Sequence, residues 1–436
     1  MALPIAGAPA QGSGGQPGMN YRPALTLLAS LFFMWGFITV INGTLLPHLR
    51  SVFELSYFQT TLIESVWFIA YFFASIPSAK LIERIGYQRS MVAGLGLMAA
   101  GALLMVPAAM IPSYGVTLFA LFVIASGITL LQVAANPYVA VVGAPETASS
   151  RLNLVQAFNS AGATLAPLFG GYLILGRTAG GTAAAGDAVL TEAERLADAQ
   201  SVILPYLLVA AVLAVLAIVI ARFPFPALGA STQRYAKEER RGKSLFQHRN
   251  LVLAIPAMIA YLLAEIGVGN LFINFVSQPD IGNLTQQQAS NYLFLLWGGM
   301  MVGRLIGAFA MQRMEPGLAL AIAGIGATIV MLIATFASGH TAMWALISVG
   351  LFHSIMFPTI FTLGIRGLGP LTEEGSGLLI MAIAGGALVA VQGVLADAYG
   401  LQWSFLLTVV CELFVVYYAL WGSRPTNALP APRPAE

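Results

Sequence analysis

Residues 79–89 read AKLIERIGYQR and residues 303–313 read GRLIGAFAMQR, so a basic residue, Leu-Ile and a final Gln-Arg recur at the same spacing. Each copy follows a long apolar stretch. A second pair of segments also matches, GAPE at residues 143–146 and GP at residues 369–370 before two glutamates. Matched segments in corresponding positions indicate two similar halves, an arrangement that membrane transporters use to build a binding site at the interface of the halves.

The composition requires a lipid environment. Of the 436 residues 58% are hydrophobic and 9% are charged, whereas a soluble domain has about 25% charged residues. A helix needs about 20 apolar residues to cross a bilayer, so the chain has room for twelve spans joined by short loops. We therefore predict an all-α polytopic membrane protein of two six-helix bundles, with spans near 24–46, 58–80, 90–111, 114–142, 152–176, 201–222, 251–278, 289–311, 317–337, 341–365, 375–396 and 402–422.

The basic residues predict the topology. With both termini in the cytoplasm, only Arg50, Arg177 and Arg195 lie outside, and the other 17 of the 20 Lys and Arg residues (20 − 3) lie inside. The first 21 residues lack the basic and apolar regions of a signal peptide. The expected domains are a disordered cytoplasmic tail (1–21), an N-terminal bundle (22–223), a basic cytoplasmic linker (224–250), a C-terminal bundle (251–423) and a cytoplasmic tail (424–436).

Several classes of function are not supported by the residues present. A single cysteine, Cys411, excludes an internal disulfide. Neither a Cys/His metal cluster nor a nucleophile–base pair is visible, so we expect no metal, no cofactor and no enzyme activity. The net charge of +2 is too small to indicate a nucleic-acid partner. The fold is expected to work as a monomer.

The segment from Lys80 to Arg89 resembles the loop between helices 2 and 3 of the major facilitator superfamily, with Glu83 where an Asp is usual. Opposite charges there can hold one conformation shut and release it in another, although they can also serve only as topology signals at the lipid headgroups. The residues assigned to this gating network are Lys80, Glu83, Arg84, Arg89 and Arg304.

A closer resemblance covers most of the chain. Several strings look like those of the fucose permease and glucose/galactose transporter family: FMWGF at 33–37, LP at 46–47, AANP at 134–137, SRLNL at 150–154, FNS at 158–160 and FPTIF at 357–361. This resemblance implies a proton- or sodium-coupled monosaccharide symporter in the bacterial inner membrane.

Polar side chains at membrane depth are costly and mark candidate binding residues. Amides can donate to and accept from sugar hydroxyls, and an indole can cover the apolar face of a pyranose. The alternative stays open that these amides only hydrogen-bond neighbouring helices. The candidate sugar ligands are Trp35, Asn42, Gln132, Asn136, Gln156 and Asn159 in the first half, and Asn270 and Asn274 in the second.

The chain departs from the resembled family at its coupling carboxylates. The family places acidic residues where this chain has Gly43 and Gln132, and neither can bind a proton. Phe357 also stands where a cavity Tyr is expected. The family's coupling mechanism therefore cannot be transferred at these positions.

Other ionisable groups could take over the coupling. Glu265, near the middle of the seventh span, is the first choice, because a buried carboxyl can take up a proton and an ionised one can bind sodium. Glu64 is the second choice, although it could be a hydrated residue near the outer mouth. His353 is the third, although it could be a packing histidine. Glu412 and Asp397 are weaker candidates, and Glu412 is expected to hydrogen-bond a neighbouring helix.

These residues favour a cation-coupled monosaccharide symporter that works by alternating access. The missing carboxylates leave a facilitated sugar uniporter as the alternative. Drug efflux and a membrane-embedded enzyme are less favoured, because the central polar residues are amides suited to hydroxyls.

Overall fold

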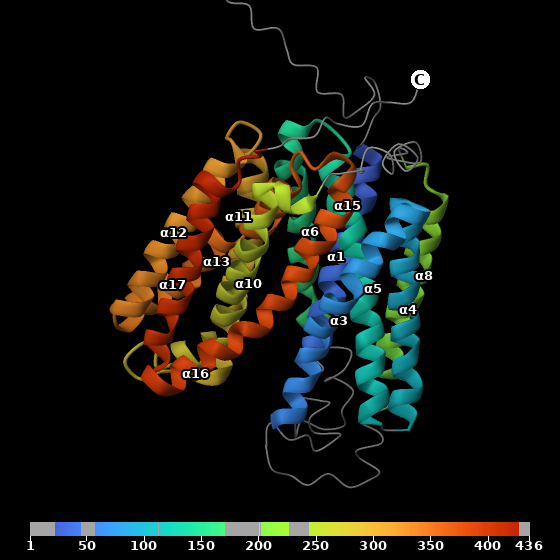
Figure 1. The fold of residues 1–436 in the computed structure, drawn as a ribbon. Coiled ribbons are helices and arrows are strands. Elements are labelled where there is room, and N and C mark those ends of the chain that lie inside the picture. Colours follow the sequence, from blue (N-terminus) through green and yellow to red (C-terminus); the bar gives the residue numbers. More distant parts are fainter. Residues whose placement is uncertain are drawn as a thin grey trace, which may run out of the picture.

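A computed structural model describes residues 22–44, 57–111, 113–170, 200, 202–225 and 244–426. Within these ranges the first half contains the long helices α1 (Arg22–Thr44), α3 (Tyr57–Ile85), α4 (Tyr87–Met110), α5 (Tyr114–Val141), α6 (Ala148–Gly170) and α8 (Ile203–Arg222). The second half contains α10 (Arg249–Val276), α11 (Gln286–Ala310), α12 (Pro316–Phe336), α13 (Gly339–His353), α14 (Met356–Ile365), α15 (Thr372–Met381), η5 (Ala382–Leu388), α16 (Val389–Tyr399), α17 (Leu401–Tyr417) and η6 (Tyr418–Gly422). Figure 1 shows the two halves side by side as two bundles.

Eleven helical segments of the described residues are long and apolar enough to cross a membrane. The twelfth is α6, which has a buried polar side that includes Asn153, Gln156 and Ser160, while Leu154 and Phe158 are exposed. This helix can span the bilayer because its polar side packs against α1, α11 and α14. The predicted fold of twelve spans is confirmed, and most spans begin and end within a few residues of their predicted bounds.

The outer surface is apolar. Along α12, Leu318, Ile322, Ile325, Ile329 and Ile333 are 40–51% exposed and recur at steps of three and four residues. In water such a stripe would be a large exposed hydrophobic patch. Its solvent is therefore the hydrocarbon of the bilayer.

Two predicted spans are interrupted in the second half. The span at 341–365 breaks between α13 and α14, because Pro358 has no N–H to donate to the carbonyl of Ser354. The span at 375–396 passes through the 3-10 segment η5, which contains Gly385 and Gly386. A β-carbon on either glycine would collide with side chains of α10, so these glycines permit the close contact.

The two halves contact each other at one end of the bundle, which we call the closed end. Figure 1 shows it at the top, where α15 lies beside α3, while α16 turns away toward α17. Helix α6 packs against α11 and α14, and α3 packs against α15 and η5. Hydrogen bonds that cross between the halves there join Ser149 to Thr362 at 2.6 Å, Asn153 to Thr359 at 3.3 Å, and Tyr87 to Glu373 at 3.0 Å.

Candidate functional site

Four predicted amides of the first half lie on α5 and α6. Gln132, Asn136 and Gln156 are buried and Asn159 is partly buried. Gln132 Nε2 donates to the hydroxyl of Tyr71 on α3 at 2.5 Å, and Asn159 Nδ2 donates to the carbonyl of Phe32 on α1 at 3.0 Å. These amides therefore face the interior of the bundle and not the lipid.

Much of the hydrogen-bonding capacity of these amides is unused. Gln132 Oε1, both polar atoms of the Asn136 side chain, Gln156 Nε2 and Asn153 Oδ1 have no hydrogen-bond partner among the described residues. Buried polar atoms are nearly always satisfied, because desolvating them without a partner costs about 1–3 kcal/mol each. A cluster of unsatisfied amide atoms on two adjacent helices is typical of a place where water or a polar ligand binds.

Two aromatic residues lie on helices that pack against α6. Trp35 on α1 is nearly buried, with its ring 5.3 Å from that of Phe32. Phe357 on α14 is buried, with its ring 6.4 Å from that of Phe361. The side chains of Asn42 on α1 and Glu64 on α3, both predicted site residues, lie outside the described part of the chain.

Arg304 on α11 joins the two halves. Its Nη1 donates to the Gln156 carbonyl at 3.1 Å and to the Ser160 hydroxyl, both on α6. Its Nε donates at 3.1 Å to the Ser354 carbonyl, which Pro358 leaves without its usual helical donor. The side chain is only 8% exposed, so Arg304, which was predicted to belong to the gating charge network, lies buried between the two halves.

Tyr261 and Glu265, one turn apart on α10, adjoin this arginine. The Tyr261 hydroxyl has no hydrogen bond of normal geometry within the described residues, but it lies close enough to Glu265 and Arg304 to interact with both charges. Glu265 is partly buried. The structure therefore places Glu265, the first predicted coupling carboxyl, and Arg304 near the same tyrosine hydroxyl.

Tyr261 also contacts a buried pair of ionisable residues, His353 and Glu412. His353 Nε2 and Glu412 Oε1 are 2.9 Å apart, and the two side chains are 2% and 1% exposed. The ring of Tyr261 meets that of His353 edge to face, with centroids 6.0 Å apart. Glu412 hydrogen-bonds a neighbouring helix, α13, as predicted. Its partner is His353, which the sequence suggested separately as a coupling group.

The remaining predicted residues lie elsewhere. Asn270 and Asn274 on α10 are exposed. Lys80, Arg84 and Arg89 are exposed around the α3–α4 turn, and Glu83 is partly buried beside them. Arg304 bonds to none of these four charged residues.

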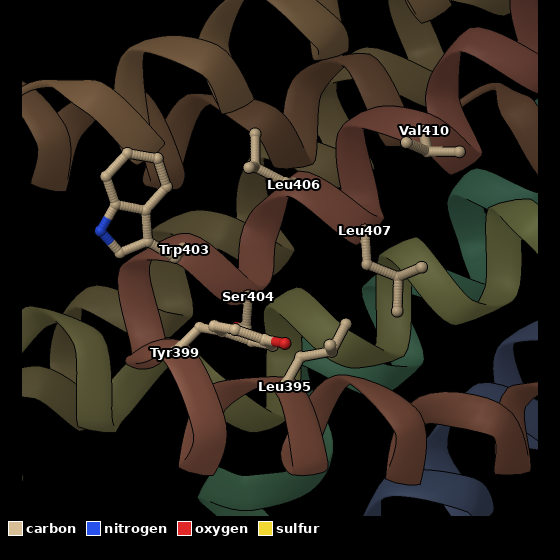
Figure 2. Close-up of a pocket in the computed structure, with 7 residues that line it drawn as sticks. All are labelled: Leu395, Tyr399, Trp403, Ser404, Leu406, Leu407 and Val410. Atoms are coloured by element: carbon tan, nitrogen blue, oxygen red, sulfur yellow. The ribbon is translucent and has the colours of Figure 1, made fainter.

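A separate groove of about 530 Å³ lies between α16 and α17. Figure 2 shows its lining: Leu395, Tyr399, Trp403, Ser404, Leu406, Leu407 and Val410. Its side chains are almost all apolar, and no predicted site residue lines it. Exposed rings and aliphatic groups of this kind suit lipid chains better than a polar solute.

Sequence reasoning missed the roles of Tyr71, Tyr261 and Ser354. The i, i+4 spacing of Tyr261 and Glu265 was a signal that both side chains share one helix face. Pro358, four residues after Ser354, was a signal that a backbone carbonyl is free inside the membrane. The pairing of His353 with Glu412 had no signal in the sequence, because 59 residues separate them.

Two bundles of six spans, an internal repeat, and polar groups at membrane depth beside the contact between the halves define a multi-pass membrane transporter. The profile of the Major Facilitator Superfamily matches residues 27–391. The chain belongs to this superfamily, whose members are transporters and not enzymes.

Individual relatives place the chain within the superfamily. The glucose/galactose transporter of Brucella abortus is 46% identical over 406 residues, which cover 93% of this chain and 95% of that protein. The L-fucose-proton symporter of Escherichia coli is 34% identical over 413 residues, covering 93% and 94%. A crystal structure of the transporter FucP in the outward conformation aligns with a TM-score of 0.83 and 33% identity, over 93% of this chain and 99% of that one. The chain therefore belongs to the family of glucose/galactose and fucose transporters, as the sequence strings predicted.

Proposed function

We propose that this protein is a monosaccharide symporter that imports a hexose-type sugar, such as glucose, galactose or fucose, together with a proton or sodium ion. The sugar and the cation bind between the two bundles, and the bundles rock to expose the site to each side in turn. The observation that carries the proposal is the group of buried amides with unused donors and acceptors in Gln132, Asn136 and Gln156. The names of the relatives, glucose/galactose transporter and L-fucose-proton symporter, agree with this chemistry.

In this proposal the amides hold the sugar hydroxyls and the Trp35 ring covers the C–H face of the pyranose. Asn159 and Asn42 are the further proposed sugar ligands of the first half. Asn270 and Asn274, which are exposed on α10, are the proposed sugar ligands from the second half. In this proposal the sugar hydroxyls take the place of water as hydrogen-bond partners of these amide atoms.

The closed end is assigned to the cytoplasm of a bacterial inner membrane, with both termini inside. The Lys and Arg residues that the structure describes lie at or near this end: Arg22, Lys80, Arg84, Arg89, Arg151, Arg222, Arg249, Arg304, Arg313, Arg366 and Arg424. Cytoplasmic loops carry such an excess of positive charge. The structure then represents the state that accepts sugar from outside, and the protein functions as a monomer. The charged turn from Lys80 to Arg89 supports the closed end from the surface.

Glu265 is the proposed coupling carboxyl, with Glu64 and His353 as the further candidates. Glu265 and Arg304 both interact with Tyr261, so in this proposal ionised Glu265 attracts the guanidinium that otherwise bonds to α6. A uniporter is the second candidate function. It is favoured because this chain has Gly43 and Gln132 at two positions where the resembled family has acidic residues. The Gln132 amide donates to the Tyr71 hydroxyl.

Uptake by purified protein in liposomes tests the proposal. Labelled glucose, galactose, fucose and N-acetylglucosamine are offered under an imposed proton or sodium gradient. We expect accumulation of at least one sugar above equilibrium, and we expect Glu265→Gln to abolish accumulation while sugar exchange continues.

The matched control is Glu315→Gln, which removes an exposed carboxyl at the start of α12 and should accumulate sugar like the wild type. Equilibration without accumulation under every gradient would establish the uniporter instead. Transport of none of these sugars would refute the proposed function.

A further inference from the structure

The pair formed by His353 and Glu412 is a buried contact inside the second half in which both partners can change charge. It lies between α13 and α17 with both side chains almost fully buried. Thr328, Thr335 and Thr408 in the neighbouring helices are also buried, but their hydroxyls do not ionise. Buried ionisable residues are expensive in a membrane interior, and they are found where a charge is moved.

The geometry of the pair suits binding of one proton. A neutral imidazole can donate from Nε2 to the carboxylate, which leaves the pair with a charge of −1. Adding one proton gives either an imidazolium with a carboxylate or a neutral imidazole with a carboxylic acid, and both forms have no net charge. Glu412 Oε2 is buried and has no hydrogen-bond partner among the described residues, so the negative form is incompletely compensated and favours uptake of a proton.

The pair is linked to the contact between the halves through one residue of backbone. Ser354 follows His353, and its carbonyl accepts from Arg304 Nε at 3.1 Å. The same guanidinium holds the first half through Gln156 and Ser160. A second link runs through Tyr261, whose ring contacts His353 and whose hydroxyl interacts with the charge of Arg304.

The neighbouring titratable groups are few. Helix α10 contributes Tyr261 and Glu265, and α11 contributes Arg304. Helix α17 contributes Cys411, which lies beside Glu412. Helix α12, which packs against both α13 and α17, has no titratable residue between Pro316 and Phe336. The far ends of α13 and α16 have His340 and Asp397, and η6 has Tyr418, whose hydroxyl donates to the Asn250 carbonyl.

We propose that the coupling ion is a proton, that the His353–Glu412 pair binds it, and that the charge of the pair sets how firmly Arg304 holds the first half. This inference rests on the proposed symport and identifies its cation. It assigns the proton to His353 with Glu412 in place of Glu265, and Glu265, which interacts with the same tyrosine as Arg304, then acts on the guanidinium without binding the proton itself. When the pair is neutral, Arg304 bonds to α6 and the closed end stays shut until sugar binds. When the pair loses its proton, its negative charge draws the guanidinium toward the second half and loosens the closed end.

The coupling cycle follows from these two states. A protonated carrier without sugar stays facing outward, so protons do not leak. Sugar binding provides the free energy that separates α6 from Arg304, and the proton is released to the inside with the sugar. In the deprotonated carrier the closed end opens and shuts without sugar, so this form returns without cargo, which is the requirement for import driven by a proton gradient.

The test compares proton movement with sugar exchange in the reconstituted full-length protein. External pH is followed with a dye while a transported sugar is added, and exchange is followed as counterflow at equal pH. In His353→Gln and Glu412→Gln we expect sugar-driven proton uptake to fall at least about tenfold, while counterflow stays within about threefold of the wild type. The double variant should be no worse than either single variant, because the two residues act as one site.

His340→Gln is the matched control, since it changes an exposed histidine at the start of the same helix and should leave proton uptake unchanged. Glu412→Asp keeps an acid in the pair, so it tests whether misfolding accounts for a loss of proton uptake in the Gln variants. We expect it to keep sugar-driven proton uptake with a shifted pH optimum.

The outcomes separate this inference from the proposed function. Wild-type proton uptake in both Gln variants, or an unchanged pH optimum in Glu412→Asp, would overturn the inference and leave sugar transport intact. Accumulation driven by sodium with no proton movement would also overturn it alone. Absence of any sugar transport by the wild type would overturn both.

Discussion

Removing the Arg304 guanidinium should open the closed end. The arginine makes two hydrogen bonds to α6 across the interface, to Gln156 and to Ser160. Hydrogen bonds from a charged donor contribute about 1.5–3 kcal/mol each, so their loss should shift the equilibrium between shut and open forms by at least about 3 kcal/mol. Because about 1.4 kcal/mol corresponds to a factor of ten, Arg304→Gln should raise the population of the open form about 100-fold.

Cysteine labelling measures this population. Cys411 is first replaced by alanine, which leaves no other thiol. Ser149→Cys then places a buried thiol at the closed end, where the serine bonds to Thr362 across the interface. The rate of reaction with a small maleimide reports how often this end opens, provided that opening is fast compared with labelling.

The expected result is labelling about 100-fold faster in Arg304→Gln than in the same background with Arg304 intact. Arg313→Gln is the control, because it removes an exposed charge just after α11 and should not change the rate. A labelling rate in Arg304→Gln within about twofold of the background rate would refute the view that this arginine stabilises the contact between the halves.

Three further predictions have distinct expected outcomes, and two of them include a comparison variant. Pro358→Ala supplies an N–H that can donate to the Ser354 carbonyl and so competes with Arg304 for this acceptor. Labelling at the closed end should therefore become about tenfold faster. Gly162→Ala puts a β-carbon 2.1 Å from a backbone oxygen of α1 and should lower the free energy of unfolding by about 1–3 kcal/mol in thermal melts, whereas Gly96→Ala meets nothing within 4 Å and should melt like the wild type. Asn136→Leu removes an amide with no internal partner, so calorimetry should show at least about tenfold weaker sugar binding with no loss of thermal stability. Gln402→Leu should do the reverse, because its amide bonds two carbonyls at the end of α12.

The fold was predictable because hydrophobicity and charge act locally along the sequence. Apolar stretches of about 20 residues locate the spans, and polar breaks locate their ends, so the predicted bounds of α4 and α5 agree closely with the structure. The polar side of α6 was also readable, since Asn153, Gln156 and Ser160 recur at helical spacing. These features depend on the residues of one helix alone.

The candidate site was predictable only in part, because it depends on which helices become neighbours. The sequence identified Arg304 as a basic residue near a helix end, but burial and its bonds to α6 follow from how α11 packs against the other half. It identified His353 and Glu412 singly, and it could not show that α13 and α17 bring them within 2.9 Å. Long-range contacts of this kind leave no periodic pattern in the chain.

Among the described residues, the two halves contribute different kinds of polar side chain to the candidate site. The first half contributes amides, which recognise hydroxyls but cannot change charge, and the second half contributes Glu265, His353 and Glu412, which can. Arg304 is linked to both kinds of side chain. It donates to the backbone carbonyl of Gln156 in the first half, and it interacts with Tyr261 in the second. In the proposed mechanism, a sugar bound beside α6 and a proton bound in the second half therefore act on the same guanidinium. Coupling requires such a shared element, because two ligands influence each other only through a structure whose equilibrium both of them shift.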